Sequence, residues 1–144
     1  MKVLDFLKKN FQPVSDAKKS NKTFPGIVAA KVIDIEKHTN ADRLRIIKLN
    51  IGEQTVYPVV CGAFNFGIGD IVVLALPGAQ IAQNIHSEAH EPFVLEKAKI
   101  RGVESKGMIC AAFELGLTKE PGQGIMVLNS SITPGSQFLP EMVK

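Results

Sequence analysis

The sequence of 144 residues predicts a small all-β protein, either a barrel or a sandwich of short strands. Two observations predict it. From Phe24 onward, short alternating or apolar stretches follow one another and are separated by Gly and Pro, which is typical of strands and corners. Long helical periodicity is absent from this part of the chain. A hydrophobic content of 45% is sufficient for one compact core.

The first residues differ from the rest and are predicted to form a separate arm, residues 1–23. Residues 2–12 place apolar side chains at helical spacing, which predicts a short amphipathic helix. Residues 13–22 are rich in Lys and Ser and read as a linker. The strand-rich domain is then residues 24–144. The apolar positions of the arm are Val3, Leu4, Leu7 and Phe11.

Three consecutive antiparallel strands open the predicted domain. Residues 27–35 are rich in β-formers, residues 44–51 alternate, and a turn at Gly52 and Glu53 leads into residues 55–60. One helical turn is expected over residues 113–117. Further strands are predicted over residues 71–76, 92–101, 107–111 and 125–128.

The stretch 97–110 concentrates the features of an anion-binding site. Its apolar residues alternate on one face of a strand that is expected to kink at Gly102, and a hairpin is expected over residues 105–110. Gly102 and Gly107 bracket Ser105 and Lys106, so the backbone can turn tightly and offer N–H groups to phosphate. The alternative is an ordinary solvated strand face followed by a turn. The cations on the opposite face are Lys97, Lys99 and Arg101.

This stretch resembles the Lys-x-Arg-Gly-Val-x-Ser-x-Gly-Met-x-Cys signature of the tRNA-binding domain family, with every position filled. The family occurs in phenylalanyl-tRNA synthetase beta chains, methionyl-tRNA synthetase extensions and free-standing tRNA-binding proteins. Residues 60–65 resemble its Val-Cys-Gly-Ala-x-Asn turn and residues 75–79 its Ala-x-Pro-Gly-Ala corner. Residues 38–44 resemble its His-Pro-Asn-Ala-Asp-x-Leu loop, with Thr39 in place of proline.

The resemblance implies an OB-fold, a Greek-key β-barrel, with short C-terminal additions. It also implies that tRNA is the partner and that the chain is similar to the beginning of a phenylalanyl-tRNA synthetase beta chain. Because 144 residues are too few for that whole chain, we expect a fragment or a stand-alone relative. Free-standing members of the family pair as dimers, so a homodimer is an alternative.

Two uncharged groups complete the expected site. Asn65 has a donor and an acceptor for a base edge or a ribose hydroxyl, or it caps its own turn. Ser105 with the backbone of Gly107 and Met108 is expected to contact an anion, while the alternative is a hydrogen bond within its own turn.

Arg101 is expected to fork onto a phosphate or stack on a base, with a surface ion pair to Glu96 or Glu104 as the alternative. Lys97, Lys99 and Lys106 would attract phosphate without reading sequence. Phe64 and Phe66 are secondary candidates for stacking on a splayed nucleotide, although Phe is more often a core residue. Residues 38–42 are expected to shape a loop.

The net charge of +3 is unevenly distributed. Residues 1–25 carry six lysines against Asp5 and Asp16, whereas residues 26–144 carry eleven Lys and Arg against twelve Asp and Glu. Binding to nucleic acid would therefore depend on a local cluster of cations, and we expect it to be weak, with a modest salt dependence.

No catalytic activity, metal ion or cofactor is expected. The sequence lacks the Gly-x-Ser-x-Gly, phosphate-loop and His-Glu-x-x-His motifs, and His86 and His90 lie in what reads as an exposed excursion. Cys61 and Cys110 lie in apolar surroundings and are expected to be buried, reduced thiols. With no apolar run long enough to cross a bilayer and no signal-like start, a soluble, cytoplasmic protein is expected.

Two classes of function follow. The first is a non-catalytic tRNA-binding module that binds the RNA backbone and an unstacked nucleotide and so assists a synthetase. The second is a structural module whose amphipathic arm docks on another subunit while the binding face of the barrel is vestigial.

Overall fold

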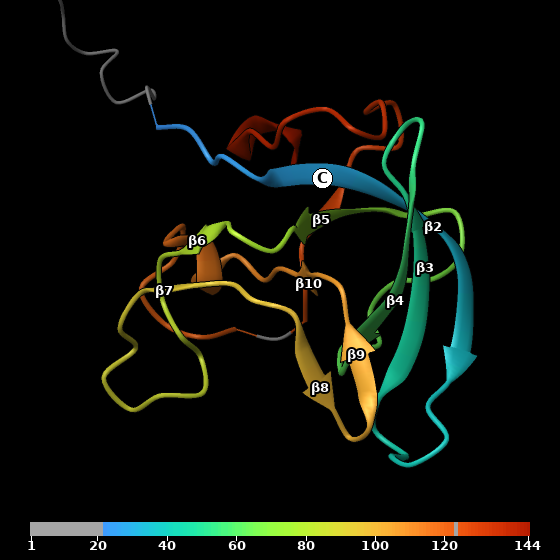
Figure 1. Ribbon diagram of the computed structural model, residues 1–144. Coiled ribbons are helices and arrows are strands. Elements are labelled where there is room, and N and C mark those ends of the chain that lie inside the picture. The colour runs from blue at the N-terminus through green and yellow to red at the C-terminus, as the bar shows by residue number, and fades with distance from the viewer. Residues whose placement is uncertain (1–21, 123) are drawn as a thin grey trace, which may run out of the picture.

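The computed structural model describes residues 22–122 and 124–144 as one curled antiparallel sheet with smaller hairpins beside it (Figure 1). The predicted helix over residues 2–12 and nearly all of the predicted linker lie outside the described residues. Within the described part of the chain, regular helix is limited to two single 3-10 turns. The all-β prediction is confirmed.

The main sheet has the strand order β10-β5-β2-β3-β4, and β11 also pairs with β5. All pairings are antiparallel, and irregularities in the pairing of β3 with both neighbours accompany the curl into a half-barrel. The three consecutive strands predicted from the sequence are confirmed. The strands are β2 (Ile27–Lys37), β3 (Arg45–Asn50), β4 (Thr55–Cys61), β5 (Ile71–Ala75), β10 (Met108–Ile109) and β11 (Val127–Leu128).

The curl brings β4, at one edge, beside the segment that precedes β10, at the other. The amide of Lys106 donates to the carbonyl oxygen of Pro58 at 2.9 Å. The amide of Val60 donates to the hydroxyl oxygen of Ser105, also at 2.9 Å. These two bonds, here called the β4 seam, connect residues that are 48 and 45 positions apart in sequence.

Two apolar layers lie on the two faces of the sheet. One fills the inside of the curl and contains Val32, Ile47, Leu49 and Leu74, all 0% exposed. The other lies between the outer face and the C-terminal segment, where Phe138 packs edge-on against Phe24 with ring centroids 5.3 Å apart. Because both of its faces are covered, β5 is buried at every residue, which explains its continuous apolar sequence.

The region from residue 92 to 110 departs from the prediction. The single strand expected over residues 92–101 is wrong: it is divided into β7 (Phe93–Val94), which pairs with β6 (Gln80–Ile81), and β8 (Ala98–Ile100), which pairs with β9 (Val103–Ser105). The break is at Leu95, whose backbone hydrogen-bonds to the corner at Gly78 and Ala79. Strand β6 was not predicted.

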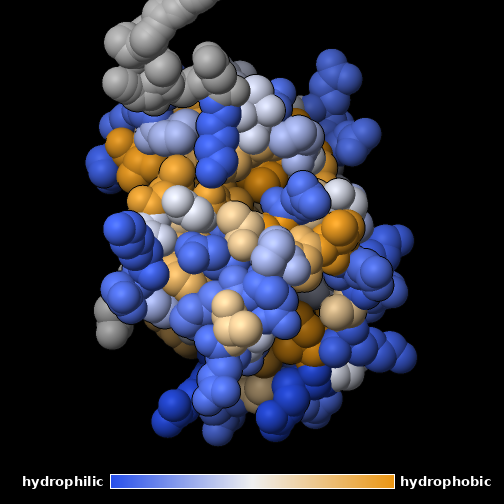
Figure 2. Space-filling model, turned by 90° about the vertical axis from the view of Figure 1, so that its left-hand side faces the viewer, coloured by the Kyte–Doolittle hydropathy of each residue, from blue (hydrophilic) through white to orange (hydrophobic). Residues whose placement is uncertain are grey.

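The side of the molecule formed by β6, β7 and their connecting loop exposes apolar side chains among polar ones (Figure 2). Val94, at 52% exposed, is one of them. The predicted helical turn is confirmed as η2 (Phe113–Leu115), and a second turn, η3 (Pro140–Met142), lies near the end of the chain. In the described residues, no helix is long and apolar enough to cross a membrane.

Candidate nucleic-acid interface

A groove runs between the β8–β9 hairpin, the turn after β4 and the segment that leads into β11. We call it the hairpin groove. It has a volume of about 480 Å³, and its walls include Ala63, Ile100 and Ile125. Met108, one of the predicted site residues, also lines it. Arg101 and Phe64, both exposed, directly follow two of these wall residues in the chain.

The hairpin reverses at Arg101 and Gly102, and both have positive φ, 53° and 90°. A two-residue loop of this kind is the tight turn that matches the twist of paired strands. The expectation that the strand only kinks at Gly102 and that a hairpin spans residues 105–110 is therefore wrong. Glycine adopts the left-handed conformation freely, whereas for arginine it is uncommon and costs about 1–2 kcal/mol.

The hairpin tip is attached to the loop after β2. His38 is 2% exposed, and its Nε2 lies 3.1 Å from the carbonyl oxygen of Ile100. Its Nδ1 accepts the amide of Asn40 at 3.0 Å, so this arrangement fits an imidazole with its proton on Nε2. The Arg101 guanidinium donates to the Asn40 carbonyl oxygen at 3.2 Å. The structural role predicted for this loop is confirmed.

The predicted cations occupy different positions on and beside the β8–β9 hairpin. Arg101 is exposed, so part of its guanidinium faces solvent at the tip. Lys99 is exposed as well, but it lies directly across the ladder from Glu104, on the face of the hairpin opposite to the half-buried Ile100. Lys97 and Lys106 are exposed on either side of the hairpin.

Ser105 has a structural position. The residue is 3% exposed, its hydroxyl accepts the Val60 amide, and it donates to the Gly107 carbonyl oxygen at 2.9 Å. This is the internal turn hydrogen bond that the sequence left as an alternative. At Gly107 a Cβ would lie 3.0 Å from the backbone oxygen of Ala75, so the glycine permits a close approach to β5.

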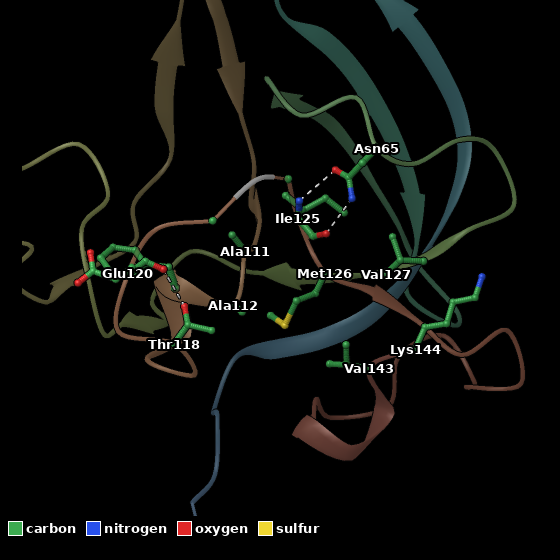
Figure 3. A pocket seen from close by; sticks show the side chains of 13 residues that line it. Asn65, Ala111, Ala112, Thr118, Glu120, Ile125, Met126, Val127, Val143 and Lys144 are labelled. Carbon is green, nitrogen blue, oxygen red and sulfur yellow. Dashed lines mark hydrogen bonds between the residues drawn. The ribbon is translucent and has the colours of Figure 1, made fainter.

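Asn65 uses both ends of its amide to hold another loop (Figure 3). Its Nδ2 donates to the carbonyl oxygen of Ile125 at 3.0 Å, and its Oδ1 accepts the Ile125 amide at 3.0 Å. We call this pair of bonds the Asn65 clamp. Gly124 has a φ of 77°, and a Cβ there would lie 2.5 Å from Asn65 Oδ1. The clamp joins the turn after β4 to the segment before β11, and Ile125 lines both the hairpin groove and a second pocket of about 450 Å³.

The sequence interpretation missed Arg45. Its guanidinium carbon lies 4.5 Å from the ring centroid of Phe64 and 4.8 Å from that of Phe66. Arg45 also donates to the carbonyl oxygens of Ala63 and Phe66, both at 3.2 Å. Phe66 is 6% exposed and belongs to the core inside the curl, whereas Phe64 is 57% exposed. Arg45 lies two residues before the buried Ile47 in β3, so the two side chains share the inward face of the strand. This spacing could have predicted that Arg45 points inward.

Burial raises the pKa of three titratable groups in and beside the hairpin groove. Glu114 is 9% exposed and accepts the Ala111 amide at 2.8 Å, and burial raises its pKa although His86 lies nearby. Burial also raises the pKa of the Cys61 thiol and, further, that of the Cys110 thiol. Both are free and buried, as predicted. Neutral thiols are poor nucleophiles.

No three His, Cys, Asp or Glu side chains gather as ligands for a metal ion in residues 22–122 and 124–144. The two histidines of the predicted excursion have different surroundings. His86 lines the hairpin groove, whereas His90 packs edge-on against the ring of Phe113 at 4.8 Å. The lining of the groove is mostly apolar, with His86 and Glu114 among its polar side chains.

Comparison with protein families gives the class of this chain. Residues 27–137 match the family model described as "Putative tRNA binding domain". The chain belongs to the tRNA-binding domain family.

Two of the curated relatives are subunits of one type of enzyme. Residues of this chain are 43% identical over 106 positions to the phenylalanine–tRNA ligase beta subunit of Wolinella succinogenes, covering 74% of this chain and 12% of that protein. The corresponding subunit of Aromatoleum aromaticum is 38% identical over 125 positions, covering 87% of this chain and 14% of that one. The chain is thus homologous to a domain-sized part of these subunits and spans a small fraction of their length.

Two solved structures share the fold. The methionyl-tRNA synthetase (MetRS) related protein from Pyrococcus horikoshii superposes with a TM-score of 0.55 at 16% identity, over 89% of this chain and all of that one. The C-terminal domain of Plasmodium vivax p43 gives a TM-score of 0.51 at 20% identity, over 78% of this chain and 58% of that one.

Proposed function

We propose that this protein is a non-catalytic module that binds tRNA along the hairpin groove and raises the local concentration of tRNA for a synthetase. The hairpin tip contacts the ribose-phosphate backbone, and an unstacked nucleotide occupies the groove. The curled sheet with its β4 seam acts as an OB-type barrel, whose loops and strand face are a common platform for nucleic acid. Membership of the tRNA-binding domain family supports this function.

The observation that carries the proposal is the conformation of Arg101. An arginine held at positive φ in a two-residue turn is less stable than asparagine or glycine there, and such strain tends to persist where it serves function. The side chain is exposed beside the groove, its free N–H groups are available to phosphate, and its backbone is fixed by Asn40.

The synthetase is proposed to be phenylalanyl-tRNA synthetase, in whose beta subunit the homologous domain occurs. The module acts either as a part of such a subunit or as a relative that works beside it, as a monomer or a homodimer, in the cytoplasm. Few phosphates are neutralised by one arginine and scattered lysines, so affinity is auxiliary and the salt dependence modest.

The test uses Arg101→Asn, because asparagine accepts the left-handed conformation and the variant therefore keeps its fold. Labelled tRNA is titrated into wild type, Arg101→Asn and the control Lys48→Ala, which removes one charge from β3. We expect Arg101→Asn to lose about 1–3 kcal/mol of binding free energy while the melting temperature stays equal or rises. Lys48→Ala is expected to bind like wild type.

Equal binding by all three proteins would reject the site at the hairpin tip. Absence of tRNA binding by the wild type at low salt would reject the function itself and favour the structural module. An equal loss in both variants would indicate attraction to the overall charge rather than contact at Arg101.

A further inference from the structure

Phe64 is a large apolar residue that is exposed and is not part of either hydrophobic core cluster. It lies in the turn after β4, two residues from Phe66, which fills the core inside the curl at 6% exposed. Phe64 keeps 57% of its surface in solvent. From the sequence, the two rings are equivalent candidates for stacking. In the structure only Phe64 is exposed enough to stack on a ligand.

The ring of Phe64 is held in place by Arg45. The guanidinium lies over both phenyl rings, and its hydrogen bonds to the carbonyl oxygens of Ala63 and Phe66 tie it to the backbone on both sides of Phe64. One face of the Phe64 ring is therefore covered by a fixed cation, and the exposed area lies on the other face and the edges. The next residue, Asn65, is fixed by its clamp on Ile125.

This arrangement of Arg45 and Phe64 lowers the stability of the free protein. Arg45 Nε is buried and has no hydrogen-bond partner among the described residues. A buried donor without a partner destabilises the fold, and an exposed phenyl ring does not offset that loss. An exposed aromatic face next to a wall residue of the groove is, however, suited to stacking on another flat ring.

We propose that Phe64 is a stacking platform for one unstacked nucleobase of the bound RNA, and that Arg45 is a positioning residue that holds the ring in its exposed orientation. The inference rests on the proposed function and adds to it the place where the base lies. Ala63 and Ile100 line the same groove, and Phe64 and Arg101 are the exposed residues that directly follow them in the chain. A nucleotide has a flat base for one and an anionic backbone for the other, a combination that an apolar protein segment lacks.

The platform lends itself to a direct optical test, because the chain contains no tryptophan. Phe64→Trp introduces a single indole at the platform. We expect its fluorescence to fall as a single-stranded RNA or a tRNA is added, with the same midpoint as binding measured by the RNA label. The matched control is Tyr57→Trp, which replaces another exposed aromatic beside a cation, Lys48, on the sheet. Its emission is expected to stay constant while RNA binds.

Phe64→Leu keeps apolar bulk and removes the aromatic face. We expect it to weaken binding by roughly 5- to 150-fold, the equivalent of one lost base stack, with an unchanged melting temperature. An RNA with an abasic nucleotide in place of the stacked base is expected to bind wild type and Phe64→Leu equally.

The positioning role of Arg45 has its own readout. When Arg45→Met is combined with Phe64→Trp, we expect the fluorescence anisotropy of the introduced indole to fall in the free protein, because the ring loses the cation that holds it. When Arg45→Met is combined with Phe64→Leu, we expect RNA binding to be nearly the same as in Arg45→Met alone, since the two residues act as one unit.

The outcomes separate the two proposals. If Phe64→Leu binds as well as wild type, or the indole emission of Phe64→Trp stays constant while the RNA label reports binding, the platform is wrong and tRNA binding stands. If wild type binds no RNA at low salt, both fail. If Phe64→Leu unfolds, Phe64→Trp still decides, since it keeps an aromatic ring at this position.

Discussion

The hairpin tip and the β4 seam are neighbours in sequence, but their polar groups are in opposite situations. Arg101, at the tip, is exposed and carries backbone strain. Ser105, four residues later, is buried, and its hydroxyl both accepts and donates a hydrogen bond within the protein. The tip exposes hydrogen-bond donors of Arg101 to solvent, whereas the hydroxyl of Ser105 at the seam is fully hydrogen-bonded within the protein.

This difference separates two kinds of residue inside one sequence signature. Ser105 and Gly107 keep the edge of the curled sheet attached to β4 and allow β10 to approach β5. Asn65 belongs with them, because it holds the segment before β11. Arg101, Lys106 and Phe64 remain exposed after the fold is complete. The family motif therefore contains both an exposed residue, Arg101, and buried or bonded residues that hold the fold together.

The largest effect is expected at the seam. Ser105→Ala leaves the buried Val60 amide without its acceptor, so the free energy of unfolding should fall by about 1–3 kcal/mol. Chemical denaturation measures this, with Ser136→Ala as the control, since that exposed hydroxyl only bonds within its own turn. Binding of tRNA per folded molecule should not change. Unaltered stability together with a loss of binding would instead place the hydroxyl on the ligand.

A smaller effect is expected at the Asn65 clamp. Asn65→Ala removes both hydrogen bonds to Ile125 from an exposed position, and we expect a loss of about 1 kcal/mol in stability. Asn50→Ala is the control, because Asn50 caps only its own turn through the Gly52 amide. Hydrogen exchange at the Ile125 amide should rise in Asn65→Ala alone. Unchanged exchange there would show that the clamp is dispensable.

The strands that were predicted correctly are those whose pattern is local. Alternation in β3 and the unbroken apolar run of β5 reflect one buried face and two buried faces respectively. The failure between residues 92 and 110 has a local cause as well. Two-residue turns of this type usually contain Asn-Gly or Asp-Gly. Here the first position is arginine, so the sequence did not predict the turn.

The roles within the site were less predictable because they depend on partners far along the chain. Asn65 bonds to a residue 60 positions away and Ser105 to one 45 positions away, and no periodicity encodes these pairs. Arg45 differs, since its inward register in β3 was visible in the sequence. The sequence pattern did not predict that the rings of Phe64 and Phe66 would both contact the Arg45 guanidinium.

The smallest effect tests whether the tip acts alone or with the rest of the hairpin. Lys99 and Glu104 are directly opposed on the outer face, so their charges largely cancel for an approaching phosphate. Glu104→Gln should therefore strengthen tRNA binding by about 0.5 kcal/mol, and Lys99→Gln should weaken it by a similar amount. The double variant should return to the wild-type affinity, which titrations at two salt concentrations measure. If Lys99→Gln alone weakened binding as much as Arg101→Asn, the backbone of the RNA would lie across the whole outer face, and the hairpin would act as one basic surface rather than through its tip.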